Sequence, residues 1–425
     1  MDIIQSYLCA LASFNTNIRL LLLRTLTMGL FSGIYGIIFN LYILDMGFRA
    51  DFLGLLLSMS LLTSSAMSIP AGILCDRFDR RKIMVFSSAL SLAAILPIFV
   101  SQSPYVLLLF SALYGIFSSL SAVCLTPILA ENCGRETVHV FSANASLGWI
   151  ATVLGSALGG VLPGLWAREF AAVNTYQITL LTSAALLIVS CGLLVMLKKM
   201  KCPRTAHGPR RLPPFSLKGI RPSPTVLKFT LTSMTFGIAS GMIVPYFNIY
   251  FMKVLNMGVF EIGLTSAVAG AFMIVGFIGT PYITSKIGKV RSAVVTKAIS
   301  APVLLLMALT TDLVLAAAAY VAYMFLINMA GPATTSFQME QIHPREQGFA
   351  VGLMSTGSCL AVSASSLLSG ILIANDNYLV PFILTGAGYL ATAALLYHYF
   401  RDAEQGSRVA RMPMPLAESR IAHKS

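Results

Sequence analysis

Residues 29–42, GLFSGIYGIIFNLY, and residues 237–250, GIASGMIVPYFNIY, are two copies of one pattern. Two glycines, a serine, a phenylalanine, an asparagine and a tyrosine recur at the same six of fourteen positions, 208 residues apart. At a separation of 209 residues, Glu131 corresponds to Glu340 and Gly148 to Gly357. The chain is therefore predicted to consist of two halves with the same fold.

The amino-acid composition indicates a membrane protein. Of the 425 residues, 56% are hydrophobic and 11% are charged, and the mean hydropathy is +0.80. A soluble domain needs about 25% charged residues to cover its surface. A chain with less than half of that share must bury most of its exterior in lipid, which excludes the soluble enzyme folds.

Apolar stretches of about 20 residues, each long enough to cross a hydrocarbon core of about 30 Å, recur along the chain. Because lipid offers no partner for backbone N–H and C=O groups, these stretches must be helices rather than open strands. The predicted fold is all-α, a polytopic membrane protein with twelve transmembrane helices in two pseudo-symmetric six-helix bundles. The expected spans are residues 19–44, 52–75, 83–100, 105–130, 140–165, 176–197, 225–252, 262–283, 292–311, 313–337, 348–373 and 378–399.

The two bundles are expected over residues 19–197 and 225–399. Residues 198–224 between them contain six prolines and eight Lys or Arg but no acid, which is typical of a solvated linker. Residues 1–18 and 400–425 are expected to be an N-terminal segment and a basic tail, both in the cytoplasm.

The basic residues predict how the chain is oriented. If the spans alternate in direction, 25 of the 29 Lys and Arg, Arg24 among them, fall on one side, which should be the cytoplasmic side. Both termini are then cytoplasmic, and the plasma membrane is the expected location. The net charge of +13 is explained by anionic lipid headgroups beside these residues, so no nucleic-acid partner is expected.

The cysteines and the polar motifs predict no catalytic, metal or cofactor site. The sequence has no nucleotide-binding loop of the form Gly-x4-Gly-Lys-Ser/Thr and no cluster of His, Cys and acids, so an enzyme is not expected. Four of the seven cysteines lie in or at the ends of predicted helices, and the other three fall on the cytoplasmic side. Neither a disulfide nor a metal site is therefore predicted.

The loop between the second and third spans reads GILCDRFDRRK over residues 72–82. It resembles the signature of the major facilitator superfamily, in which Gly, three residues and Asp-Arg precede a second glycine and basic residues; Asp79 replaces that second glycine. A weaker copy, SKIGKVR, occupies residues 285–291. The resemblance covers about residues 19–399 and implies a secondary transporter of small molecules, in which two rocking lobes expose a central cavity alternately to each side.

The same resemblance implies a cytoplasmic gate. Gly72 would let another helix approach closely, and Asp76, one turn later, would face the start of the eleventh span near Gly348 or pair with an arginine. That bond would hold the outward-open state and break when the protein opens inward. The other residues expected in this network are Arg77, Arg80, Arg81, Glu131 and Glu340. Two alternatives stay open: the arginines only fix topology, and the acids only end helices.

By resemblance, the first, fourth, seventh and tenth spans surround the cavity. The amides of Asn40 and Asn248 are candidates for hydrogen bonds to a solute, as are tyrosine hydroxyls. The alternative is that the asparagines bond across to another helix and the tyrosines anchor at the interface. The further candidates are Tyr35, Tyr42, Tyr114, Tyr246, Tyr250, Tyr323 and Asn328.

No Asp, Glu or His lies near the middle of a span, and Lys297 is close enough to Arg291 to reach the membrane surface. A small neutral or largely apolar solute is therefore expected, with Asp45 as a possible protonation site and a proton or sodium ion as a possible coupling ion. The glycines between Gly155 and Gly164 resemble an exporter signature, so export is predicted; the alternative is that these glycines only allow tight packing. The transporter is expected to be a monomer. The alternatives are an uptake carrier for a neutral nutrient such as a sugar, and a sensor or lipid-handling protein that does not transport.

Overall fold

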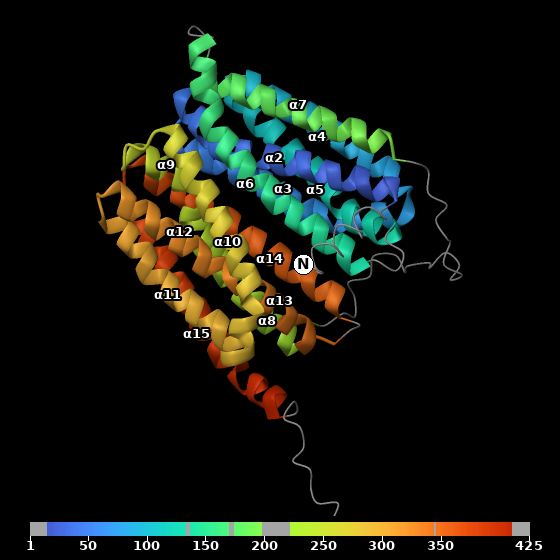
Figure 1. Cartoon of the computed structure of the whole chain (residues 1–425), viewed down its shortest axis with the longest axis vertical. Coiled ribbons are helices and arrows are strands. Elements are labelled where there is room, and N and C mark those ends of the chain that lie inside the picture. The colour runs from blue at the N-terminus through green and yellow to red at the C-terminus, as the bar shows by residue number, and fades with distance from the viewer. Residues whose placement is uncertain (1–14, 133–136, 170–173, 198–221, 344–345, 410–425) are drawn as a thin grey trace, which may run out of the picture.

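The computed structural model describes residues 15–132, 137–169, 174–197, 222–343 and 346–409. Within these ranges all regular secondary structure is helical, and twelve helical segments are long and apolar enough to cross a membrane. The all-α, twelve-span prediction is confirmed. Figure 1 shows the helices as two bundles side by side.

Within the described residues, the N-terminal half has six helices and the C-terminal half has eight, with one 3₁₀ turn. The N-terminal helices are α2 (Thr16–Asp45), α3 (Ala50–Arg77), α4 (Arg80–Val100), α5 (Pro104–Asn132), α6 (Thr137–Glu169) and α7 (Thr175–Val195). The C-terminal elements are α8 (Pro224–Ile243), η1 (Val244–Tyr246), α9 (Phe247–Lys253), α10 (Val259–Ile287), α11 (Lys289–Leu309), α12 (Leu313–Met329), α13 (Gly331–Gln341), α14 (Gln347–Ala374) and α15 (Leu379–Val409). The face where α2 begins and α15 ends is called the terminal face below, and the opposite one the far face.

Two predicted spans are interrupted. The seventh becomes α8, η1 and α9 around Pro245, and the tenth becomes α12 and α13 at the step from Ala330 to Pro332. A proline carries no backbone N–H and its ring crowds the preceding turn, so it interrupts a helix at this point. The last helix continues to Val409, ten residues past the expected end at 399.

The sequence repeat is also a repeat of contacts. The Tyr42 hydroxyl donates to the Phe99 carbonyl at 2.7 Å, and the Tyr250 hydroxyl donates to the Met307 carbonyl at 2.8 Å, each across 57 residues. These hydrogen bonds tie the first helix of each half to its third. The two halves are therefore built by the same tertiary interactions.

The repeated glycines allow close packing within each half. A Cβ atom on Gly33 of α2 would lie 2.5 Å from the Ser156 amide nitrogen of α6. A Cβ atom on its copy, Gly241 of α8, would lie 2.6 Å from the Val362 carbonyl oxygen of α14. Because lipid gives helices little hydrophobic drive to associate, such contacts between small residues hold membrane bundles together.

The two halves meet in the half of the membrane next to the far face. Gly160 of α6 lies against Gly263 of α10, and Gly54 of α3 against Gly370 of α14. Close to these contacts, the Ser58 hydroxyl donates to the Ser363 carbonyl at 2.7 Å. The far face is therefore closed between the halves.

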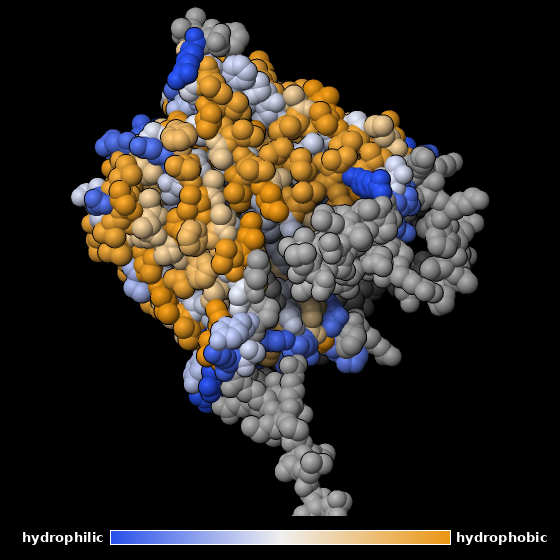
Figure 2. Space-filling model, viewed as in Figure 1, coloured by the Kyte–Doolittle hydropathy of each residue, from blue (hydrophilic) through white to orange (hydrophobic). Residues whose placement is uncertain are grey.

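The outer surface agrees with a membrane environment. Figure 2 shows hydrophobic side chains over the flanks of the helices and hydrophilic ones gathered toward their ends. Among the exposed apolar side chains of this surface, Val275 of α10 is 61% exposed and Val314 of α12 is 73% exposed.

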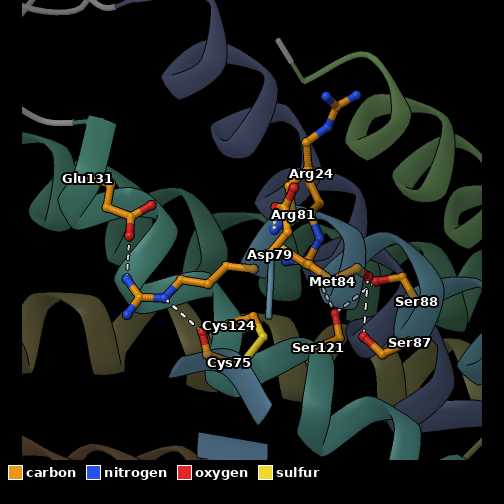
Figure 3. The surroundings of a disulfide bond; sticks show 11 residues. Arg24, Cys75, Asp79, Arg81, Met84, Ser87, Ser88, Ser121, Cys124 and Glu131 are labelled. Carbon is orange, nitrogen blue, oxygen red and sulfur yellow. Dashed lines mark hydrogen bonds and ion pairs between the residues drawn. A yellow bond between two sulfur atoms is a disulfide. The ribbon is translucent and has the colours of Figure 1, made fainter. Parts of the chain in front are cut away.

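Cys75 and Cys124 form a disulfide, so the prediction that no disulfide forms is wrong (Figure 3). Cys75 lies in the last turn of α3 and Cys124 in α5, and both side chains are buried. The two helices pack side by side and bring the Cα atoms within 6.0 Å. A separation of 49 residues between different helices gives no sequence signal of this proximity.

We expect Gly33→Val to destabilise the protein, because the new side chain must displace the backbone of α6. Overpacking of this kind costs about 1–3 kcal/mol. The apparent Tm of the purified protein should fall. Gly36→Val on the same helix is the control, because no described atom lies within 4 Å of a Cβ there. Equal Tm values for the two variants would contradict the proposed packing role of Gly33.

Peptide mapping without reductant should recover one cross-linked pair that contains Cys75 and Cys124. After denaturation, Cys191 and Cys359, which are free thiols, should react with an alkylating reagent at once. Cys75 and Cys124 should react only after reduction. Alkylation of all four without reductant would exclude the disulfide.

Candidate solute cavity

A cavity of about 1060 Å³ lies between α6 of the N-terminal half and the C-terminal half. Its walls extend from Phe236 and Lys297 to Gln338 and Met339 near the end of α13, which is on the terminal-face side of the contacts that close the far face. The other lining residues are Ala145, Ser146, Trp149, Ile150, Thr232, Ser233, Ile274, Phe277, Ile327, Asn328, Gly331, Thr334, Thr335, Val351, Met354, Ser355, Ser358, Thr392 and Leu396.

The walls of this cavity are mainly apolar, with a few neutral polar groups. Trp149 and Phe277, 6.0 Å apart between ring centroids, line it from opposite halves. Hydroxyl and amide groups come from residues such as Thr232, Ser358 and Asn328. Apolar walls with a few directed polar groups are typical of sites for organic ligands.

Lys297 of α11 lies in the wall of this cavity, so the expectation that it reaches the membrane surface is wrong. Its side chain is 9% exposed, and Nζ lies 4.3 Å from the centre of the Phe236 ring. The cation–π contact is worth about 0.5–2 kcal/mol, whereas burying an ion costs several kcal/mol.

A second, smaller cavity of about 230 Å³ lies inside the N-terminal half and contains Arg24. Arg24 was assigned from sequence to the cytoplasmic surface, but its side chain is only 4% exposed. One terminal nitrogen, Nη2, donates to the Ser121 hydroxyl at 2.9 Å (Figure 3), and Nε has no hydrogen-bond partner among the described residues. The guanidinium is thus buried and incompletely satisfied.

The two cavities occupy corresponding places in the repeat. In the first helix of each half, Thr25 lines the smaller cavity and Ser233, 208 residues later, lines the larger one. In the sixth helix, Leu187 and Leu396, 209 residues apart, line the two cavities in the same way. The charges do not correspond. Arg24 corresponds to Thr232 at a separation of 208 residues, and Lys297 corresponds to Ser88 at a separation of 209 residues.

Asn40 and Asn248 bond to each other across the halves instead of lining either cavity. Asn40 Nδ2 donates to Asn248 Oδ1 at 3.0 Å and also to the Pro245 carbonyl. Asn248 Nδ2 donates to the Ile37 carbonyl at 3.0 Å. In a continuous helix, the Ile249 N–H would bond to the Pro245 carbonyl. Here the helix is interrupted and the Ile249 N–H bonds to Asn248 Oδ1 instead, so the Pro245 carbonyl is available to Asn40.

Most of the candidate tyrosines make hydrogen bonds within the packed helices. Besides Tyr42 and Tyr250, the Tyr246 hydroxyl donates to the Ser366 carbonyl at 2.6 Å. The Tyr323 hydroxyl bonds to that of Tyr389 at 2.7 Å.

The remaining three candidates are divided among different places. Tyr35 stacks on Phe39 at 4.6 Å between ring centroids. Tyr114 lines the smaller cavity, and Asn328 lines the larger one. Lys297, Arg24 and Trp149 were not among the candidates, although a basic residue within a predicted span was a sequence signal for the first two.

Several predicted gate residues pair within their own half. Arg80 forms an ion pair with Glu131, and Lys289 forms one with Glu340 at 2.6 Å, each across 51 residues. Figure 3 shows the first of these pairs at Glu131, close to the disulfide. Arg81 Nη2 donates to the Val195 carbonyl at 2.8 Å. The repeat thus joins the start of the third span to the end of the fourth in the N-terminal half, and the start of the ninth to the end of the tenth in the C-terminal half.

The expected latch between the halves stays a prediction. The side-chain surroundings of Asp76, Arg77 and Gly348 lie outside what the structure describes. No described atom lies within 4 Å of a Cβ built on Gly72.

Comparisons with known proteins agree with this architecture. No curated protein sequence matches the chain. The nucleoside transporter NupG superposes with a TM-score of 0.72 and 13% sequence identity, covering 91% of this chain and 100% of that one. A bacterial homologue of the human lysosomal transporter Spinster, inward-facing and occupied, gives 0.74 and 16%, covering 91% and 96%. The family model of the Major Facilitator Superfamily matches residues 21–365 of the sequence, and the chain therefore belongs to that family.

Proposed function

We propose that this protein is a secondary transporter that moves a small, largely apolar organic solute across the membrane by alternating access. The observation that carries the proposal is a cavity of about 1060 Å³ on one side of a closed contact between two repeated halves. Rocking of the halves would break the Asn40–Asn248 contact, open the far face and close the terminal one.

We place the terminal face in the cytoplasm of a cell bounded by its plasma membrane. The excess of Lys and Arg on that face supports the orientation. The cavity then faces inward, so the solute enters it from the cytoplasm or leaves it there.

Closure of the terminal face would bring the end of α3 toward the start of α14. The gate residues Gly72 and Asp76 lie at that end of α3, and the Arg80–Glu131 and Lys289–Glu340 pairs fix neighbouring helix ends within each half. Each half can therefore move as a rigid body while Asp76 makes and breaks its bond across the gap.

Export driven by a proton or sodium gradient is the direction and energy source that we propose. The glycine-rich stretch of α6 supports export by its resemblance to exporters, and it also has a packing role: Gly155 lies against Leu30 of α2. The cavity is complete within one chain, which supports a monomer as the transporting unit.

A cysteine in the cavity should be accessible from both sides of the membrane. Ser355 is exposed and lines the cavity, so Ser355→Cys should react with a membrane-impermeant thiol reagent in right-side-out and in inverted vesicles. The host protein keeps Cys75 and Cys124 and has its other cysteines replaced by alanine. Mass spectrometry of the labelled protein measures the two rates.

Val275→Cys, on the lipid-facing surface, should react from neither side and is the matched control. If Ser355→Cys reacts only from the side of the terminal face, and no gradient or solute changes this, alternating access is excluded.

We expect Asn40→Ala to open the far face more often, because it removes both hydrogen bonds that the Asn40 amide donates across the halves. At about 1 kcal/mol net for each of the two bonds, labelling of Ser355→Cys from the far face should rise roughly thirtyfold. Asn375→Ala is the control, since that amide donates to Ile371 within its own helix. An equal effect of the two substitutions would exclude a gating role for Asn40.

A further inference from the structure

The two buried cations bear on the chemical class of the solute. Among the residues that the structure describes, those that line the two cavities include Lys297 and Arg24 but no Asp or Glu. We infer that the transported solute carries an anionic group, a carboxylate or a phosphate, and that Lys297 binds this group. The inference rests on the proposed transport function and gives the solute's charge.

Lys297 is positioned to bind an anion from the cavity. It lies eight residues after the start of α11 at Lys289, a depth of about 12 Å along the helix axis. The aromatic ring of Phe236 is the contact that the described residues offer to its ammonium group. Glu261, Asp312 and Glu340 of the C-terminal half lie at helix ends, and Glu340 pairs with Lys289. A buried cation with an aromatic contact and no carboxylate retains most of its desolvation cost, which an anionic ligand would offset.

Arg24 adds a second positive charge at a comparable depth. It lies eight residues after the start of α2 at Thr16, and its Nε is buried without a hydrogen-bond partner among the described residues. Ser88, the counterpart of Lys297, bonds to Ser121, which in turn accepts from Arg24. In a medium of low dielectric constant, charges act over longer distances than in water, so both halves favour a negative solute.

The other lining residues of the larger cavity indicate the chemical character of the rest of the solute. Trp149, Phe277 and Ile274 offer apolar surface, while Thr232 and Asn328, whose donors bond within their own helices, offer hydrogen-bond acceptors. The volume suits a drug-sized organic molecule or a single-chain lipid. The ligand class is therefore an amphipathic organic anion, either a soluble acid or an anionic lipid with one acyl chain.

The test measures binding with pairs of probes that differ in charge but little in shape. Cyclohexanecarboxylate and cyclohexanecarboxamide represent a soluble acid and its neutral analogue. Lysophosphatidate and monoacylglycerol represent an anionic lipid and its neutral analogue. The protein has two tryptophans, so Trp166→Phe leaves Trp149 in the cavity wall as the fluorescent reporter.

We expect the anion of at least one pair to bind with a Kd about tenfold lower than its neutral analogue. The pair that shows this preference identifies the source of the anion. Lys297→Met should abolish the preference, and Lys297→Arg should keep it. Without ligand, Lys297→Met should not lower the Tm, because it removes an uncompensated buried charge, whereas loss of a merely structural lysine would lower it.

Equal affinities for both members of both pairs would overturn the inference, as would an unchanged preference in Lys297→Met. Neither result affects two-sided labelling of Ser355→Cys, so the transport proposal is tested separately. Loss of two-sided labelling with retained preference for anions would instead indicate a protein that binds such anions without transporting them.

Discussion

The hydrogen bond between Asn40 and Asn248 is the contact on which the relation between the two halves depends. These residues are copies of each other, and two equivalent residues can touch only close to the pseudo-two-fold axis. Asn40 lies five residues before the end of α2, next to the far face. The asparagine amides therefore hold the two halves together on that side, and each is also bonded to a backbone carbonyl of the opposite half.

This contact requires α2 and α9 to approach closely, and the glycines provide that approach. Gly33 and Gly241 let α2 and α8 pack against the fifth helix of their own half, while Gly54, Gly160, Gly263 and Gly370 bring the halves together. In lipid, the energy of such contacts comes from packing and hydrogen bonds, which are lost when backbones separate by a small distance. The far-face contact can therefore be broken and re-formed as a unit, as rocking requires.

The sequence was sufficient to predict the fold because hydropathic stretches and internal repeats can both be recognised from the order of residues alone. Twelve apolar stretches and the copies at 208 and 209 residues led to the correct architecture. The candidate site was predicted less well, because it depends on which helix faces meet. The periodic spacing placed Asn40 and Tyr42 on α2 but did not distinguish a cavity wall from a helix contact. Cys75 and Cys124 had no signal at all.

Differences between the two copies carry a separate kind of information. The residues that form the contacts of the proposed rocking motion are the same or similar in both halves: Asn40 and Asn248, Tyr42 and Tyr250, Arg80 and Lys289 with their glutamates. A solute, by contrast, has no two-fold symmetry, so the groups that recognise it need not repeat. The cations follow the second rule, since Arg24 corresponds to Thr232 and Lys297 to Ser88. In a scaffold whose mechanical contacts repeat, charges that do not repeat indicate where the asymmetric ligand binds.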